Sequence, residues 1–247
     1  MIKFFDEDAI ISPDKIELGS DVAVITFSDH LFDILEHDFG AKKVHELPGC
    51  TPVNVYEAEA FGKRVLLCQS TIGAPAAVGT LEELYACGVK HAVVYGICGS
   101  LVLMPPRTLI VPNRAFRDEG TSYHYMPPSD DISVKNSGIV AAHLKASGVS
   151  VLEGGVWTTD AFYRETRTRM EQLKARGAIA VDMECAALQA VSDYRKREFY
   201  TFFISADSLA GDEWNPNYIN DGKHGREPVD VTAAHAAVRL AADLSGK

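Results

Sequence analysis

The sequence predicts an α/β fold: a single domain with a mixed central β-sheet flanked by helices. Short apolar runs rich in β-branched residues alternate with longer amphipathic stretches, which is the pattern of strands buried on both faces and separated by helices. A length of 247 residues fits one large domain better than two small ones, since a domain averages about 150 residues. No internal repeat, low-complexity tract or Pro/Ser-rich linker marks a boundary, so we expect one domain over residues 1–247.

The individual elements follow from the positions of the apolar runs. The expected strands cover residues 22–27, 64–70, 92–98, 108–112, 149–157, 178–183 and 199–206. The expected helices cover residues 79–87, 133–146, 164–175, 184–194 and 228–244. Residues 49–62 are expected to form a hairpin, because four apolar residues surround a polar turn: Val53, Val55, Ala58 and Ala60.

Composition and charge exclude several classes of partner. Hydrophobic residues make up 47% of the chain and charged residues 23%, as in globular proteins with a large core. The formal charge of −10 repels phosphate backbones and anionic membrane surfaces, so a nucleic-acid polymer is not an expected partner. No apolar run reaches the roughly 18 residues of a membrane helix, and acidic residues occupy the start where a signal peptide has its apolar core. We therefore expect a cytoplasmic protein without a membrane partner.

Cysteine and histidine give no sign of a metal site. The five cysteines are an odd number without a CxxC pair, which favours reduced, buried thiols. The eight histidines are scattered and show no HExxH or similar paired spacing. We expect neither a metal nor another cofactor.

Ligands of open α/β sheets gather at the carboxyl ends of strands, and two such ends combine glycine or a carboxylate with an apolar strand. Residues 95–101 contain Gly96, Cys98 and Gly99, where a missing Cβ allows a ligand to approach the backbone closely. A simple tight turn is the alternative interpretation. Residues 180–188 deliver Glu184 to the start of a helix, either as an acceptor for sugar hydroxyls or only as a charge favoured by the helix dipole.

Two further strand ends carry a carboxylate or an aromatic ring. Residues 202–208 end in Asp207, which alternatively only caps a turn. Residues 157–163 place Phe162 beside Asp160, where the ring suits stacking on a flat heterocycle or, alternatively, packing in the core. Carboxylates that leave two buried strands each carry a desolvation cost, which a binding site would offset.

These four segments together resemble the nucleoside phosphorylase superfamily of the trimeric and hexameric type. That family includes purine nucleoside phosphorylases, uridine phosphorylases and methylthioadenosine nucleosidases. The motifs that carry the resemblance are residues 94–101, 159–163, 181–188 and 205–207, and the resemblance covers nearly the whole chain. It implies a nucleoside phosphorylase-like fold, a homo-oligomer whose neighbouring subunits complete each site, and phosphorolytic cleavage of purine nucleosides with phosphate as co-substrate.

The resemblance also implies a role for each matching residue. Cleaving an N-glycosidic bond requires stabilisation of an oxocarbenium-like sugar and a proton for the departing base. By analogy, Glu184 with Met183 holds the ribose hydroxyls, Phe162 stacks on the base, and Asp207 donates to purine N7. Desolvation by the preceding apolar strand raises the pKa that Asp207 needs for this role. The other implied substrate contacts are Gly96, Cys98, Gly99, Asp160 and Ala206.

The chain departs from the family at the phosphate site. Family phosphorylases hold phosphate with arginines at three places, where this chain has Phe32, Thr51 and Val94, and Ile97 stands where a Ser or Thr is common. Each lost charge-assisted hydrogen bond weakens binding by about 1.5–3 kcal/mol. Two alternatives therefore stay open: a hydrolytic nucleosidase, with a carboxylate such as Asp29 orienting water, and a non-catalytic nucleoside-binding relative.

Other residues are candidates to restore a phosphate site or to close over the base. Four of them, in the first turn and in residues 111–125, are candidate contacts for phosphate or the nucleoside 5′ end: Ser28, Arg114, Arg117 and His124. A subunit contact is the alternative for residues 111–125. In relatives the region after Asp207 brings a basic residue near that acid, and Lys223 or Arg226 is the candidate here, with a solvated loop as the alternative.

Overall fold

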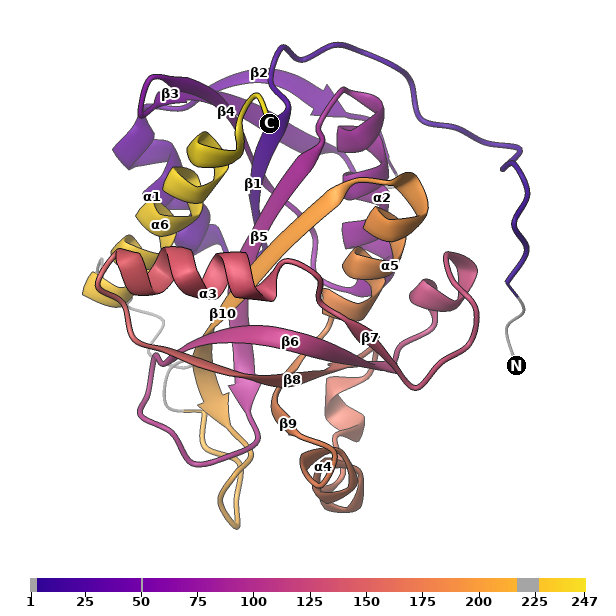
Figure 1. The fold of residues 1–247 in the computed structure, drawn as a ribbon, viewed down its shortest axis with the longest axis vertical. Helices are drawn as coiled ribbons and strands as arrows, with labels where there is room; N and C mark the ends of the chain where they lie inside the picture. The colour runs from indigo at the N-terminus through magenta and orange to yellow at the C-terminus, as the bar shows by residue number, and fades with distance from the viewer. Residues whose placement is uncertain (1–3, 50, 217–226) are drawn as a thin grey trace.

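The computed structural model describes residues 4–49, 51–216 and 227–247 (Figure 1). Within these ranges ten strands join one sheet, and six α-helices pack around it. The strands are β1 (Val22–Thr26), β2 (Lys42–Leu47), β3 (Val53–Ala60), β4 (Lys63–Gln69), β5 (His91–Ser100), β6 (Leu109–Asp118), β7 (Asp131–Ser133), β8 (Val151–Thr159), β9 (Ala178–Asp182) and β10 (Glu198–Ser208). The helices are α1 (Asp29–Phe39), α2 (Ala74–Ala86), α3 (Ser137–Ala146), α4 (Arg167–Lys174), α5 (Cys185–Arg195) and α6 (Pro228–Leu244), with short 3₁₀ helices η1 (Thr121–His124) and η2 (Phe162–Arg164).

The sheet is open at one end and closed on itself at the other. Neighbouring strands follow the order β2-β3-β4-β1-β5-β9-β8-β6-β10, and β10 also pairs with β5. The strands β5, β9, β8, β6 and β10 therefore form a small closed barrel, from which β1 to β4 extend. The pairs β1–β5 and β5–β10 are parallel, whereas β5–β9 and β6–β10 are antiparallel. The mixed central sheet predicted from the sequence is confirmed.

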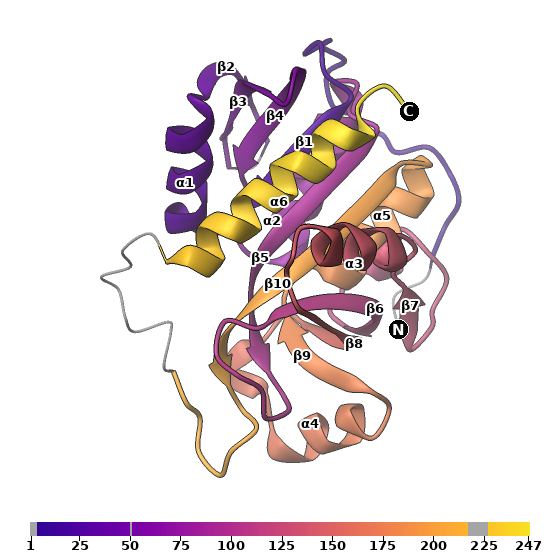
Figure 2. The same ribbon diagram turned by 60° about the vertical axis from the view of Figure 1, so that its left-hand side comes forward.

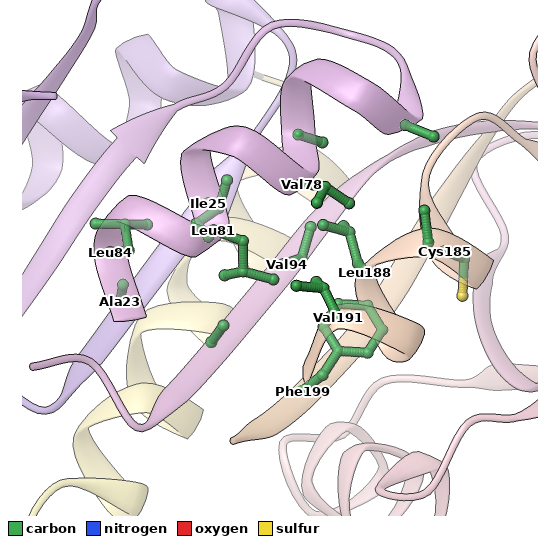
Figure 3. Close-up of a cluster of buried hydrophobic side chains, with 14 of the residues drawn as sticks. Ala23, Ile25, Val78, Leu81, Leu84, Val94, Cys185, Leu188, Val191 and Phe199 are labelled. Atoms are coloured by element: carbon green, nitrogen blue, oxygen red, sulfur yellow. The ribbon is translucent and has the colours of Figure 1, made fainter. Parts of the chain in front are cut away.

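Helices cover both faces of the sheet (Figure 2). On one face α1, α3 and α6 share a buried apolar cluster with the strands, and on the other face α2 and α5 do so. Figure 3 shows the second layer, in which Val78 and Leu81 of α2 lie near Leu188 and Val191 of α5. Because both faces are covered, the ends of the strands are the part of the sheet left for a ligand.

Most predicted elements are present, and their boundaries differ for local reasons. All seven predicted strands form, and α6 begins and ends as predicted. The strand β6 continues past its predicted end at Pro112, because this proline lies at a bulge where its missing N–H is tolerated. Helix α2 begins at Ala74 and has Pro75 in its first turn, a position that favours proline.

The hairpin predicted within residues 49–62 is wrong. These residues contribute the single strand β3, which pairs with β2 on one side and β4 on the other. The buried positions change from odd to even along the strand because its two ends face different layers. Val53 and Val55 join the cluster under α2, whereas Ala58 and Ala60 join the cluster under α1 and α6. In the sequence, this change in the spacing of apolar residues looks like two short strands joined by a turn.

Helix α1, the strands β2 and β7 and the short helix η1 have no counterpart among the predictions. Helix α1 buries Leu31, Ile34 and Leu35 at helical spacing, so its sequence carries a signal that the prediction overlooked. Strand β2 lies at the edge of the sheet and exposes Lys42 and Lys43. Lysines at an edge discourage pairing with a further strand, and they also hide the alternation by which a strand is recognised.

Candidate active site

The carboxyl ends of β5 and β10 and the end of β9 meet around Gly99. Gly99 pairs with Val181 of β9 on one side and with Asp207 of β10 on the other. A Cβ at this position would lie 2.9 Å from Val181 Cγ1 and 3.2 Å from Asp207 Oδ1. Glycine therefore allows β9 and β10 to approach each other, as expected where backbones or ligands come close.

The thiol of Cys98, the residue before Gly99, is affected by the charges of two acids. Cys98 is buried, and burial together with the charges of Asp182 and Asp207 raises the pKa of its thiol well above the usual value. The charges of two carboxylates from different strands thus act on one buried thiol. Both acids lie at or near the carboxyl ends of strands, where ligand-binding groups of α/β sheets are usually found.

Glu184 is a buried carboxyl at the junction of β9 and α5. Its side chain accepts a hydrogen bond from the backbone N–H of Gly73 at Oε1, over 2.6 Å. Burial, followed by the charge of Asp182, raises the pKa of Glu184 to about 8, and the charge of Asp160 adds to the rise. Desolvation of this kind makes the carboxyl sensitive to any positive charge that develops nearby.

A capping network holds the segment that carries Glu184. Asp182 Oδ2 accepts from the backbone N–H groups of Glu184 at 3.0 Å and Cys185 at 2.6 Å. Asp182 Oδ1 accepts from Thr158 Oγ1 at 2.7 Å, and the Thr158 hydroxyl oxygen accepts from the N–H of Ala186. Burial raises the pKa of Asp182 to about 6 despite these bonds. A carboxylate over the first N–H groups of α5 satisfies orphan donors and is favoured by the helix dipole.

Asp207 lies at a bulge near the end of β10. The pairing of β10 with β5 shifts register between Ser205 and Asp207, which leaves Ala206 as the extra residue. Trp214 Nε1 donates to Asp207 Oδ2 at 2.7 Å, and Ser100 Oγ donates to the Asp207 carbonyl at 3.1 Å. Burial raises the pKa of Asp207, although the bond from Trp214 opposes the rise. The direction is the one that an acid catalyst requires.

The end of β8 adds an aromatic surface. Asp160 Oδ2 accepts from the N–H of Gly120 at 2.9 Å, which ties this end to the segment after β6. Phe162, in η2, is 51% exposed, and its ring centroid lies 4.0 Å from that of Tyr163. Two exposed rings next to a group of acids fit the stacking surface expected for a flat heterocycle.

A pocket of about 210 Å³ opens between α4 and the segment after β10. Its lining residues are Glu165, Thr166, Arg167, Met170, Leu209 and Trp214. The pocket adjoins the acid because Trp214 both lines it and donates to Asp207. Burial, with the charge of Asp207, raises the pKa of Glu165 to about 7.

The comparison with known sequences agrees with this geometry. The sequence profile of the phosphorylase superfamily matches residues 21–244. The chain belongs to the phosphorylase superfamily. A guanosine phosphorylase from Halorubrum lacusprofundi is 28% identical over 143 residues, which cover 56% of this chain and 58% of that relative. Purine nucleoside phosphorylases of the DeoD type from Bacillus cereus and Bacillus thuringiensis are each 29% identical over 158 residues, covering 62% of this chain and 67% of each relative.

Some of the predicted residues lie at neighbouring strand ends. Gly99 contacts the strands of both acids, and Met183 lies between the capping Asp182 and Glu184. Gly96 is packed against the ring of Phe27, which a Cβ would approach to 3.2 Å. The assigned roles of these residues stay predictions.

The two arginines proposed for phosphate have other partners. Arg117 is buried, and its guanidinium donates to Ser122 Oγ at 2.8 Å, to the Pro127 carbonyl at 2.7 Å and to Ser129 Oγ at 2.9 Å. Its guanidinium carbon also lies 3.9 Å from the ring centroid of Tyr123. These contacts make Arg117 the anchor of its own loop, so we remove it from the candidate phosphate contacts.

The other predicted anion contacts are more exposed. Arg114 lies on β6 within 3.8 Å of Asp131, in an exposed ion pair. His124 ends η1, and Ser28 occupies the N-cap position of α1. Lys223 and Arg226 lie outside the described residues. The roles of Arg114, His124 and Ser28 stay predictions.

Three positions at which the resemblance implies phosphate contacts carry apolar side chains. Phe32 and Val94 are buried in the core, and Ile97 is 49% exposed at the end of β5. Asp29, at the start of α1, accepts from Gln69 Nε2 at 2.5 Å. The structure therefore gives no polar or basic side chain at these three positions.

Three residues of the site were missed by sequence reasoning. Gly73 follows β4, so the strand-end rule that found the acids extends to it. Glu165 and Trp214 belong to a turn and a loop, where no periodic or strand-end signal exists. Their place in the site comes from the packing of α4 against the segment after β10.

In residues 4–49, 51–216 and 227–247 no group of three or more His, Cys, Asp or Glu side chains is placed to hold a metal ion. Over the same part of the chain no helix is long and apolar enough to span a membrane. The prediction of reduced, buried thiols is confirmed for Cys68, Cys87, Cys98 and Cys185, and Cys50 lies outside the described residues.

Proposed function

We propose that the protein cleaves the N-glycosidic bond of purine nucleosides by phosphorolysis. The proposal is carried by two carboxyls whose pKa values burial raises: Glu184, which follows the strand that pairs with Gly99, and Asp207, which pairs with Gly99 itself. Two acids in one region with perturbed pKa values are typical of an active site. The names of the guanosine and purine nucleoside phosphorylases that resemble this chain support the same reaction.

Glu184 would act on the sugar. Its carboxyl accepts hydrogen bonds from the ribose hydroxyls, with Met183 beside it. As the bond to the base lengthens, positive charge develops on the ribose, and this charge favours the ionised form of a buried carboxyl. The stabilisation therefore grows from the ground state to the transition state, which is the condition for catalysis.

Asp207 would act on the base while Phe162 stacks on its face. The electron pair of the broken bond passes to the purine, and Asp207 donates a proton to N7 so that the base leaves as a neutral molecule. A phosphate oxygen attacks C1′ of the sugar from the opposite side. The products are the free purine and the sugar 1-phosphate.

Base release from a panel of purine nucleosides, measured with and without phosphate, tests the proposal. The panel contains adenosine, inosine, guanosine and methylthioadenosine, and the sugar product is identified in each case. We expect ribose 1-phosphate to appear only when phosphate is present. Nucleoside binding without any base release would instead identify a non-catalytic binding protein.

Hydrolysis is the second candidate, and the apolar phosphate region favours it. Phe32 and Val94 are buried and Ile97 is apolar where relatives have polar or basic groups, so water has fewer competitors at C1′. Free ribose, released at a rate indifferent to phosphate, would establish a nucleosidase.

We further propose that residues 1–247 act as one domain in a cytoplasmic homo-oligomer with a role in purine salvage. Support comes from the continuous sheet, from the match to the phosphorylase superfamily over residues 21–244, and from the homo-oligomer that the sequence resemblance implies. Light scattering of the purified protein gives the assembly size, and limited proteolysis tests for separable domains. A monomeric mass would contradict the oligomer.

A further inference from the structure

The proposed acid has a carboxyl neighbour that the reaction does not yet use. Glu165 lines the pocket between α4 and the segment after β10, and Trp214, which also lines it, donates to Asp207. Asp207 is near enough for its charge to add to the raised pKa of Glu165. One carboxyl therefore lies in the lining of the pocket, and a second is linked to that lining through Trp214.

The walls of this pocket are held in place by hydrogen bonds. Arg167 donates to the carbonyl of Leu209 at 3.0 Å and to the carbonyl of Asp212 at 2.9 Å, which fastens α4 to the loop after β10. Ser208 and Asn215 exchange two backbone hydrogen bonds of 2.9 Å each, which close that loop at its base. The position of Trp214 between these anchors is therefore fixed, and the pocket is a built feature of the fold.

Purine chemistry indicates what a second carboxyl beside the acid would contact. The edge of a purine that carries N7 also carries the 6-substituent. Adenine presents an acceptor and a donor on this edge, and 6-oxopurines present two acceptors. A base whose N7 faces Asp207 directs its 6-substituent toward the adjoining wall. We infer that Glu165 recognises the 6-substituent of the purine base, an inference that rests on the proposed function.

The two protonation states of Glu165 suit different bases. An ionised carboxyl only accepts, which fits a 6-amino group, whereas a protonated carboxyl donates, which fits a 6-oxo group. Burial and Asp207 raise the pKa of Glu165 to about 7, so both states are populated near neutral pH. Besides Asp207, the other charged group of the pocket lining is Arg167, whose guanidinium binds the two loop carbonyls. The base preference should therefore change from 6-oxo to 6-amino as the pH rises.

The experiment compares adenosine with inosine, and adenine with hypoxanthine, between pH 6 and pH 8. Ratios of kcat/KM and of Kd remove the contribution of Asp207, because both bases share N7. For the wild type we expect the ratio to shift toward the 6-amino compound by at least about tenfold, since an acid with a pKa near 7 changes from mostly protonated to mostly ionised over this range. Glu165→Gln should flatten the ratio, because an amide both donates and accepts at every pH.

Glu171→Gln is the matched control, since Glu171 lies on α4 just beyond Glu165, exposed and paired with Lys174, and this variant should keep the wild-type slope. A ratio independent of pH in the wild type, or a slope that persists in Glu165→Gln, would overturn the inference. Failure of the proposed function is distinguishable. If nucleosides are not cleaved but the free bases still show the Glu165-dependent shift in Kd, recognition by Glu165 stands and the reaction does not.

Discussion

Gly99→Ala tests whether the fold depends on the close approach around the proposed site. The new methyl group would meet Val181 Cγ1 at 2.9 Å, Leu209 Cδ1 at 3.1 Å and Asp207 Oδ1 at 3.2 Å. A contact of 2.9 Å is shorter than a Cβ tolerates, so β9, β10 or both must shift. The backbone of Gly99 is not in the left-handed region, and the effect is therefore one of space alone.

The size of the effect follows from overpacking a buried position. Forcing a methylene into a packed core costs about 1–3 kcal/mol. In a protein of this size, about 1 kcal/mol lowers Tm by roughly 2–4 °C, so the variant should melt roughly 2–12 °C below the wild type. Activity should fall more than stability suggests, because one of the side chains that must yield belongs to the proposed acid Asp207.

Thermal unfolding and base release on the same preparations measure both effects. Gly79→Ala is the control, since Gly79 lies inside α2 and a methyl group there would have no neighbouring atom within 4 Å. Alanine in a helix interior is favoured over glycine by about 0.5–1 kcal/mol, so this variant should melt at or above the wild-type temperature with normal activity. A Gly99→Ala protein with wild-type melting and wild-type activity would refute the packing argument.

Four other substitutions separate the roles of the charged groups. Asp207→Asn should lower kcat far more than it raises KM in the base-release assay, because protonation of N7 matters mainly in the transition state; equal changes in both would count against the role. In the folded protein the pKa of Glu184 is raised from 4.5 to about 8. Between these two pH values the folded state keeps a proton on Glu184 that the unfolded state has lost, so the free energy of unfolding falls as the pH rises from about 4.5 to about 8. Glu184→Gln should flatten this fall in thermal melts between pH 5 and pH 8, and an unchanged slope would contradict it. In urea unfolding, Arg117→Ala should lose about 3 kcal/mol because buried partners lose a charged donor, whereas Arg114→Ala, in an exposed pair, should stay within about 0.5 kcal/mol; similar losses would contradict the buried assignment.

The barrel and its helices were predictable because their signals are local. Most of the barrel strands contain an apolar run that the helix layers bury, and α6 is bounded by Pro228 at its start. The hairpin error arose where a local pattern has a non-local cause. Ala58 and Ala60 face a different helix layer from Val53 and Val55, and the sequence does not encode which layer covers which end of β3.

The residues of the candidate site that could be predicted from the sequence are the ones at the ends of strands. Glu184 and Asp207 both follow or end apolar strands, and the rule that ligand-binding residues lie at the carboxyl ends of strands selects both of them. The hydrogen-bond partners were not predictable in this way. Arg117 was proposed as a phosphate ligand because a basic residue in a polar loop is ambiguous, and only the packing of residues 121–131 shows its donors turned inward.

The two halves of the proposed site are held by different kinds of structure. Around Glu184 the contacts come from Asp182, Thr158 and the N–H of Gly73, all of which lie in or beside the sheet and its helices. Around Asp207 the side-chain contact comes from Trp214, in a loop that two backbone hydrogen bonds close. Loops tolerate substitution better than strands and helices because fewer buried contacts depend on them. Substitutions around Asp207, which would contact the base, should therefore cost little stability. Substitutions around Glu184, which would contact the sugar, disturb the start of α5. The preference for one base over another is therefore the property of this fold most open to variation.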